Sequence, residues 1–428
     1  MMRLAALVLI PAALAAQSPQ PFRTDSGLDC VLLESHERPL IRMELISRWD
    51  RSELPAGKQG IAGFLAEVMD AGGAGANNRA AFNRAVDALG MKFSFRPRLG
   101  SFRWTVVADS RAQEAAMELL VDAVVRPAFD GPLVESERKS MLKQAAAGSP
   151  RERGLARFLW NLGDPGTLLP PGAEGLDRIE FQDLLDFRQR VLRPEKSSLV
   201  LYGDLNLTQA KQLVLMHLGI WGPAARPPLK ASPRPAARPE PEPKLLAVLD
   251  PGPGVELWAG AVRPDPPRPG VEALLPILLT RASRARFGGF EMTFRLPAEG
   301  RTPLLIQAKV AQTDRDALVP GLMAGLERLR GTGFTPEDLA CALIQWKAEN
   351  RALPLHPEAL LRETLDGRLD PGLARAVEQV TLNDIDQALK AWLAPERLRF
   401  LLVGADAPMV QAAEKAGLKP SLILGPDS

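Results

Sequence analysis

The order of apolar and polar residues in the first half of the chain predicts a mixture of strands and helices. Ile41, Met43 and Leu45 alternate with polar residues, which is typical of a half-buried β-strand. Between residues 60 and 71 the apolar residues recur every three or four positions, which is typical of a helix with one buried side. In chain order we expect strands at 28–35, 40–46, 92–97, 101–108 and 198–202, and helices at 60–71, 78–89, 111–125, 131–147, 151–162 and 181–191.

The helix at 60–71 has one side of large apolar residues and an opposite side of small and acidic residues. The apolar stripe consists of Ile61, Phe64, Leu65, Val68 and Met69, and the glycines that follow residue 71 are expected to end the helix. The opposite side carries Gly63, Ala66, Glu67 and Asp70. Gly63 and Glu67 are four residues apart, the spacing at which two histidines on one helix can bind the same metal ion. Here that side contains no histidine.

A proline-rich segment divides the chain into two parts of similar size. Eight of the 21 residues from 223 to 243 are proline, so this segment is expected to be extended rather than folded into helix or sheet. We therefore predict an N-terminal domain at 22–221, a linker at 222–243 and a C-terminal domain at 244–426.

The second domain repeats the first at a constant offset of 201 residues. Asp183, Leu192, Pro194, Glu195, Leu201 and Gly203 correspond to Asp384, Leu393, Pro395, Glu396, Leu402 and Gly404. Further strands are expected at 245–249, 255–262 and 303–310, and helices at 271–285 and 314–329. The predicted fold is therefore α+β, with two homologous domains that each pack helices on a mostly antiparallel sheet.

Composition narrows the class of protein. A formal charge of +2 over 428 residues, with no basic run interleaved with aromatics, argues against nucleic-acid binding. Residues 1–15 combine an early arginine, an apolar run and small residues, which indicates a secretory signal peptide. We therefore expect an exported protein, in the bacterial periplasm, with no membrane span in the mature chain.

Cysteine and histidine give no sign of a reactive centre. Cys30 and Cys341 lie one in each half, within apolar runs, so we expect buried free thiols, with a disulfide as the alternative. The three histidines, His36, His217 and His356, are scattered, and no two stand at ligand spacing.

Two segments and the element order point to a known family. The segments are GIAGFLAEVMDAGG, on the helix at 60–71, and RPEKSSLVLYGDLN, which has a weaker second copy. Together with the element order, they resemble the pitrilysin/insulinase (M16) family of zinc peptidases. The resemblance is to the bacterial two-domain type and covers essentially the whole mature chain. It implies a clam-like pair of domains. In active members, a His-x-x-Glu-His signature on this helix supplies two zinc ligands and the general base, and a glutamate on a later helix supplies the third ligand.

Against that pattern, the site positions are degenerate. Gly63 and Glu67 replace the two histidines, Ala66 replaces the base, and Gln144 stands near the place of the third ligand, with Glu135 and Glu137 close by. A catalytic zinc needs three protein ligands and a general base. We therefore expect no catalytic residue, no metal site and no cofactor in this chain.

The resemblance also implies an arginine and a tyrosine from the second domain that steady the substrate. Arg284 or Arg286 is the candidate arginine, and solvated arginines before a Gly-Gly turn are the alternative. Phe290 stands at the tyrosine position, and the single tyrosine, Tyr202, lies in the first domain.

Three functions follow as hypotheses. The first is a non-catalytic subunit that pairs with a zinc-bearing M16 partner, forms part of a peptidase chamber and helps to bind peptides. Self-association is the alternative to that partner. The second is a stand-alone peptide-binding or scaffold protein. The third is an active zinc peptidase with a displaced metal site.

Overall fold

The computed structural model of this chain describes residues 19–49, 53–55, 58, 60–98, 100–162, 175–219, 221–222, 244–249, 254–261, 268–286, 292–295, 304–311, 315–352, 371–394, 397–418 and 420–424. The predicted signal peptide, nearly all of the predicted linker, His356 and Phe290 lie outside these residues. Within the described part of the chain, no helix is both long and apolar enough to cross a membrane.

The first half forms a six-stranded sheet with the strand order β1-β2-β8-β3-β6-β5. β2 and β8 run parallel, and the other neighbouring strands are antiparallel. The strands are β1 Gln20–Arg23, β2 Asp29–Glu34, β3 Leu40–Arg48, β5 Lys92–Arg98, β6 Ser101–Asp109 and β8 Ser197–Gly203. A two-stranded pair, β4 Gly73–Ala74 and β7 Pro127–Ala128, was not predicted, because each strand is only two residues long.

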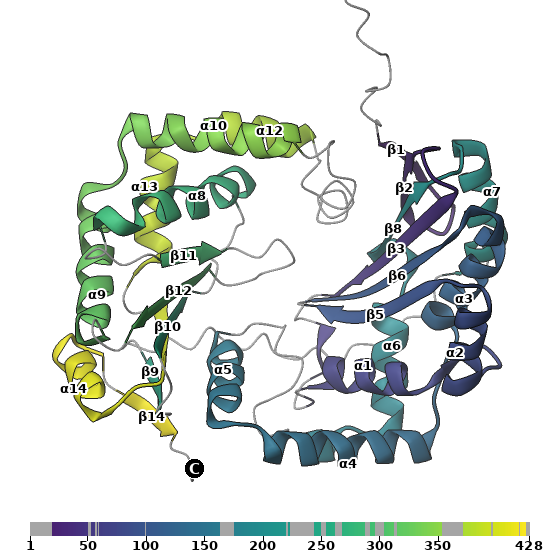
Figure 1. The fold of residues 1–428 in the computed structure, drawn as a ribbon, viewed down its shortest axis with the longest axis horizontal. Helices are drawn as coiled ribbons and strands as arrows, with labels where there is room; N and C mark the ends of the chain where they lie inside the picture. The colour runs from purple at the N-terminus through teal and green to yellow at the C-terminus, as the bar shows by residue number, and fades with distance from the viewer. Residues whose placement is uncertain are drawn as a thin grey trace, which may run out of the picture.

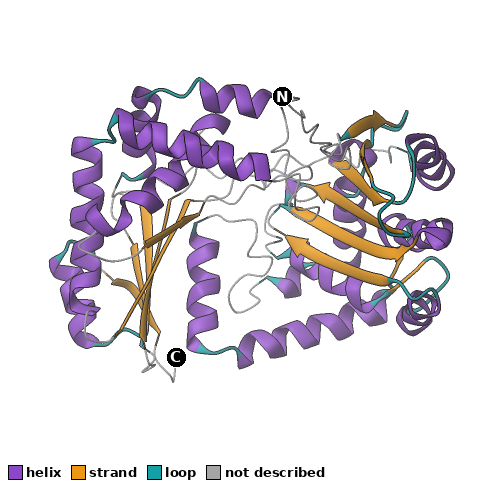
Figure 2. Cartoon of the chain, turned by 45° about the horizontal axis from the view of Figure 1, so that its top comes forward, coloured by secondary structure: helices purple, strands orange, loops and turns teal. Residues whose placement is uncertain are grey.

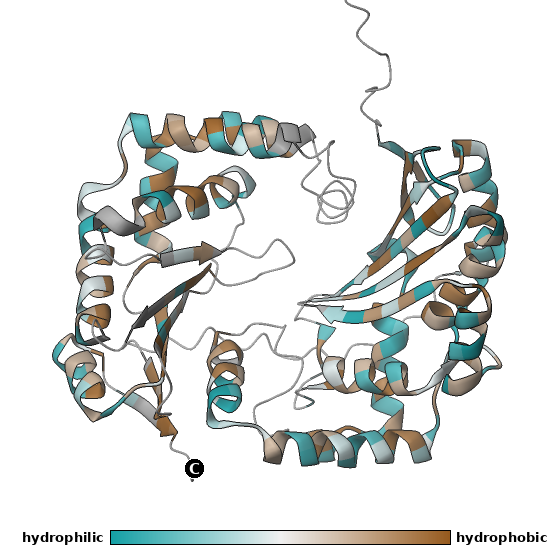
Figure 3. Cartoon of the chain, in the orientation of Figure 1, coloured by the Kyte–Doolittle hydropathy of each residue, from teal (hydrophilic) through white to brown (hydrophobic). Residues whose placement is uncertain are grey.

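Helices cover one face of this sheet (Figures 1 and 2). They are α1 Ile61–Ala71, α2 Arg79–Ala88, α3 Gln113–Val125, α4 Gly131–Ala147, α6 Phe181–Val191 and α7 Leu207–Leu218. Between sheet and helices lies a core that includes Met43, Phe64, Phe102 and Trp104, each at most 1% exposed. The predicted alternation is visible as bands of opposite hydropathy along the strands (Figure 3).

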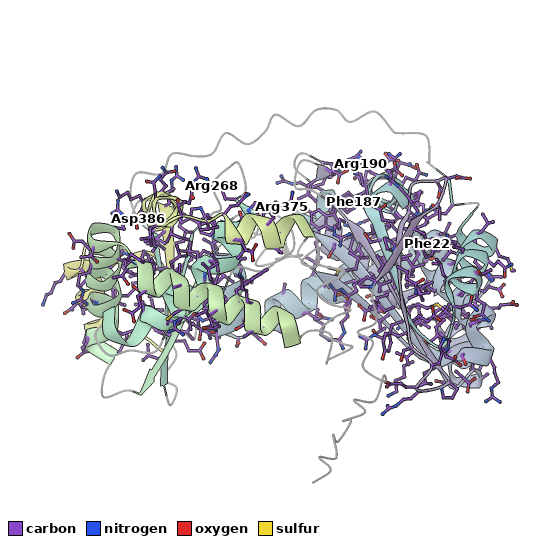
Figure 4. The ribbon with its side chains drawn as sticks, turned by 90° about the horizontal axis from the view of Figure 1, so that it is seen from above. Phe22, Phe187, Arg190, Arg268, Arg375 and Asp386 are labelled. Carbon is purple, nitrogen blue, oxygen red and sulfur yellow. The ribbon has the colours of Figure 1, made fainter. Side chains whose placement is uncertain are left out.

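The second half forms another six-stranded sheet with the order β11-β12-β10-β13-β9-β14. Its strands are β9 Lys244–Val248, β10 Gly254–Ala261, β11 Met292–Arg295, β12 Leu304–Ala311, β13 Leu398–Val403 and β14 Pro420–Leu424. Its helices are α8 Pro269–Arg286, α9 Arg315–Thr332, α10 Pro336–Ala352, α12 Pro371–Glu378, α13 Leu382–Trp392 and α14 Ala407–Lys415. A separate core fills this half. Viewed from above, α6, with Phe187 and Arg190, and the loop at Arg268 lie in opposite halves (Figure 4).

The predicted duplication is confirmed in three dimensions. α6 and α13 begin and end 201 residues apart, and so do the first residues of β8 and β13. Each of these helices starts with a capping box, in which Glu180 and Asp183 of the first copy are matched by Thr381 and Asp384 of the second. β8 and β13 also occupy equivalent sheet positions, parallel to one neighbour and antiparallel to the other.

The two copies differ at one sheet edge. In the first sheet, β1 precedes β2 in the chain and pairs with it antiparallel. In the second sheet the same edge is filled by β14, near the C-terminus, which pairs with β9 in parallel. The same edge is therefore closed by strands that do not correspond in sequence.

Helix α5, Pro150–Asn161, belongs to the first half by sequence but packs on the second sheet. Phe158 is fully buried against β9 and β13, in a cluster with Val248 and Leu401. Arg151 donates a hydrogen bond of 2.7 Å to Glu256 on β10. Packing therefore assigns α5 to the second half, although the sequence places it within the predicted domain 22–221.

Candidate functional site

Helix α1, which carries the degenerate signature positions, is packed into the core of the first half. Ile61, Phe64, Leu65 and Val68 have no exposed surface. Gly60 precedes the helix with φ of 82°, a left-handed conformation that glycine adopts without steric cost. α1 lies against α4 and α6 and beside the edge strand β5 (Figure 1). The predicted apolar stripe is therefore the side that packs into the core.

The positions that match the zinc signature lie on two helices that contact each other. Gly63 and Ala66 are buried on α1, and Glu67 is exposed there. Gln144 is exposed on α4, where its Nε2 donates a 3.3 Å hydrogen bond to Ser140 on the same helix. The structure thus brings the two helices together, as the resemblance implies, and the roles of these residues stay predictions.

Negative charge collects on this face of α1. Although Glu67 is exposed as a residue, its carboxyl is partly desolvated by its neighbours, which raises its pKa, and the nearby carboxylates of Asp70 and Glu137 raise it further. Asp70 accepts a hydrogen bond of 3.2 Å from Arg79. The site is thus a small group of acids rather than a group of imidazoles.

This donor set does not fit a catalytic zinc. Gly63 and Ala66 provide no ligand atom, and Gln144 offers an amide in place of a carboxylate. Zinc sites use thiolate, imidazole and carboxylate ligands, three of them in a catalytic centre. Among the described residues, no group of three His, Cys, Asp or Glu side chains lies close enough together to hold a metal ion.

A residue that the sequence reasoning missed, Arg138, fastens α4 over α1. Its guanidinium carbon lies 4.9 Å from the centre of the Phe64 ring. Its Nη2 donates hydrogen bonds to the Ile179 carbonyl at 2.7 Å and to Glu135 at 3.1 Å. Arg138 follows the buried Val134 by one helical turn, so its spacing could have indicated that it is buried. It was not predicted to be buried because its side chain is charged.

The candidate substrate-contacting residues are only partly described. Arg284 and Arg286 lie in the last turn of α8, and their side chains are outside the described part. Tyr202 is on β8, half-buried beside Leu33 and Val200 on the sheet face opposite the helices.

Both cysteines are free thiols. Cys30 is buried on β2, where burial and then the charge of Asp29 raise its pKa to about 12, so it is no nucleophile at neutral pH. Cys341, on α10, is only half-buried, which corrects the expectation that both are buried. Ile344 on the same helix is 68% exposed, so the apolar residues of α10 are not all in the core.

The histidines have separate surroundings. His217, on α7, borders a cavity of about 260 Å³ between α3 and α7, and its buried Nε2 has no hydrogen-bond partner within the described part of the chain. His36, after β2, is exposed and links two strand ends, through Nδ1 to Asp204 at 2.7 Å and Nε2 to Glu34 at 2.8 Å.

The contacts of His36 predict a pH-dependent stability. The two carboxylates raise the pKa of His36, so its stabilisation is complete below its unfolded pKa of about 6.5 and is lost as pH rises through the folded pKa. His36 in turn lowers the pKa of Glu34 and Asp204, whose stabilisation is lost as pH falls below about 4.

We expect His36→Gln to lower the urea midpoint more at about pH 5.5 than at about pH 8.5. An equal shift at both values would contradict this assignment.

Comparison with known proteins connects this geometry to a family. Residues 178–262 match the family model described as Peptidase M16 inactive domain. A search of curated protein sequences finds no match.

Solved structures have the same fold at low sequence identity. A protease from Helicobacter pylori has a TM-score of 0.71 at 13% identity, over 91% of this chain and 100% of that one. A putative M16-like peptidase from Alicyclobacillus acidocaldarius has a TM-score of 0.72 at 15% identity, over 90% and 98%. The periplasmic protease PqqL from Escherichia coli has a TM-score of 0.66 at 13% identity, over 94% of this chain and 50% of that one.

Residues 178–262 thus resemble the M16 inactive-domain family, and the chain shares the two-domain α+β fold of these solved structures. The resemblance and the fold class predicted from the sequence are both confirmed. The matched model is that of the inactive domain, and it spans the end of the first half and the start of the second.

Proposed function

We propose that this chain is the non-catalytic subunit of an exported M16-type peptidase. It pairs with a second M16 subunit whose His-x-x-Glu-His signature holds the zinc, forms part of the wall of the peptide chamber and contributes to peptide binding. The observation that carries the proposal is that α1 keeps its buried packing while the residues matching the zinc signature offer no adequate ligand set. The complex works in the bacterial periplasm, the compartment named for PqqL.

Two further observations support pairing. This chain covers 50% of the PqqL chain, and the separately solved first half of PqqL is covered to 97%, so a protein of this fold can join two such units in one polypeptide. Two separate chains of this size would make an equivalent assembly. In addition, α1 is packed into the core of this chain although its signature positions offer no zinc ligand set.

The first sheet has two edge strands, β1 and β5, and the outer edge of β5 is the proposed peptide-binding position; it is called the free edge below. β5 ends the strand order and lies beside α1, so among the described strands only β6 pairs with it. An unpaired strand edge can accept an extended peptide as an additional strand through main-chain hydrogen bonds. A peptide bound there would lie next to α1.

Co-expression tests the pairing. We expect the chain to co-purify with an exported M16 subunit from the same genome that carries the intact signature, and the complex to cleave a quenched fluorescent peptide that neither chain cleaves alone. Zinc analysis of the single chain is expected to find much less than one equivalent. A monomer that binds peptide without the partner would favour a stand-alone binding protein. Chelator-sensitive cleavage by the single chain, with stoichiometric zinc, would establish a displaced metal site and refute the proposal.

A further inference from the structure

The first sheet has an inner face, on the side opposite α1, α2, α3, α6 and α7. Register fixes its members, because residues directly opposite each other on neighbouring strands point to the same side. One row contains Arg96, Arg103 and Ile46; another contains Ser94, Thr105 and Glu44; a third contains Lys92, Val107 and Arg42. Arg48 follows on the same face of β3. The core residues, such as Phe93 and Phe95, alternate with them on the other side.

This inner face is basic. Over β3, β6 and β5 its described charged side chains are five cations, Arg42, Arg48, Lys92, Arg96 and Arg103, and two acids, Glu44 and Asp109. The Glu44 side chain is only 4% exposed and is paired with Arg42 and, at 3.8 Å, with Arg103. Asp109 is paired with Arg111, and the described cations outnumber the two acids, so the face has a positive potential.

Exposure increases toward the free edge. Ile46 and Val200, nearer the middle of the sheet, are at most 1% exposed, whereas Lys92 and Arg96 on β5 are exposed. Neither of these two has an ion-pair partner among the described residues. The most accessible charges thus lie on the strand whose outer edge is unpaired.

Protection of the sheet edge against unwanted strand pairing does not by itself explain the basic residues on this face. Lysine, arginine and proline on an edge strand deter unwanted pairing, and Lys92 and Pro97 fit that role. The basic residues, however, continue onto β6 and β3, where no edge needs protection. Arg96 also stands directly opposite Arg103, an arrangement of like charges that costs stability. Local costs of this kind are typical of functional surfaces.

We infer that this edge selects extended peptides with acidic side chains at alternate positions. The inference rests on the proposed function, because it assumes that a peptide adds to β5. Every second side chain of an added strand would lie on the inner face, beside Lys92, Ser94 and Arg96, where a carboxylate is favoured. The side chains between them would face α1, where Glu67 and Asp70 disfavour acids. The preferred peptide therefore has acidic residues alternating with apolar or basic ones.

Three labelled peptides of equal length test this selectivity by fluorescence anisotropy with the full chain. One alternates glutamate and valine, the second has the same composition with its glutamates in one block, and the third alternates lysine and valine. We expect the first to bind most tightly, at least about fivefold more tightly than either other peptide. Its affinity should fall as salt rises.

Charge reversal on the edge strand gives the sharper test. Arg96→Glu is expected to weaken the alternating glutamate peptide about fivefold and to strengthen the alternating lysine peptide. Opposite changes for two ligands distinguish altered selectivity from misfolding. Lys211→Glu makes the same change of charge at an exposed position of α7, on the helical side, and should alter neither affinity.

The outcomes separate this inference from the proposed function. Equal binding of all three peptides, or no reversal in Arg96→Glu, would overturn the selectivity and leave peptide binding intact. Failure of every peptide to bind would overturn the peptide-binding part of the proposed function together with the inference.

Discussion

Gly203→Ala is expected to lower the free energy of unfolding by about 3 kcal/mol or more. Gly203 ends β8 with φ of 127°, and an added Cβ would lie 2.0 Å from the Leu40 carbonyl oxygen. That oxygen is backbone, and it accepts a 2.9 Å hydrogen bond from the Asp204 amide. No side-chain rotation can relieve the overlap, so β3 and β8 would have to separate locally. Urea denaturation followed by tryptophan fluorescence measures the loss.

Gly90→Ala is the matched control for that variant. Gly90 also has positive φ, at 60°, but an added Cβ would meet nothing within 4 Å. Its expected cost is about 1 kcal/mol, from the left-handed conformation alone. Equal losses in both variants would show that backbone strain, and not the close approach of β3 to β8, dominates at Gly203.

Phe158→Ala is expected to loosen the second half of the molecule although Phe158 belongs by sequence to the first. The ring is fully buried on β9 and β13, and removing a buried phenylalanine side chain typically costs about 3–5 kcal/mol. Hydrogen exchange with mass spectrometry should show faster exchange in β9 and β13 and little change in β3 and β6. This pattern locates the effect without assuming that a chain of two units unfolds in one step.

The neighbouring residue provides the control. Arg157 is exposed on the same helix, so Arg157→Ala should change stability by less than about 0.5 kcal/mol and leave exchange in β9 and β13 unchanged. Uniform loss of protection over both sheets in Phe158→Ala would contradict the assignment of α5 to the second half.

Both expected effects concern how the two halves are built and joined. α5 is the described element that passes from the first half to the second sheet, through Phe158 and through the Arg151–Glu256 ion pair. A peptide on the β5 edge would be bound by the first sheet. Because α5 follows α4 in the chain and packs on the second sheet, variants of α5 that leave the first sheet folded can be used to ask whether peptide binding needs both halves.

Much of the fold follows from short-range patterns. The apolar stripe of α1 and the repeat that relates α6 to α13 were predicted and are confirmed. β3 is a strand as predicted, but its burial does not alternate, because every residue from Met43 to Ser47 is buried. Each depends on spacing of a few residues, or on a repeat of identical residues, which the linear sequence displays directly. The missing ligands at Gly63 and Ala66 are equally a property of the sequence, because no fold can supply a donor atom that the residues lack.

Other features depended on contacts between distant segments. Local periodicity cannot predict three of them. α5 packs on the second sheet, Arg138 is buried, and the equivalent edge strand is β1 in one half and β14 in the other. Packing energy decides them, and it depends on surfaces that come together only when the chain folds.

The sequence by itself determined the two-copy α+β architecture and the resemblance to the M16 family, and it predicted that the zinc signature is lost. Only the tertiary structure decided that Arg96, Arg103, Arg48 and Lys92 share one face beside a free strand edge. The physical reason is strand register: residues distant in the chain become neighbours through hydrogen bonding between strands, and a shift of one residue would have turned them toward the core.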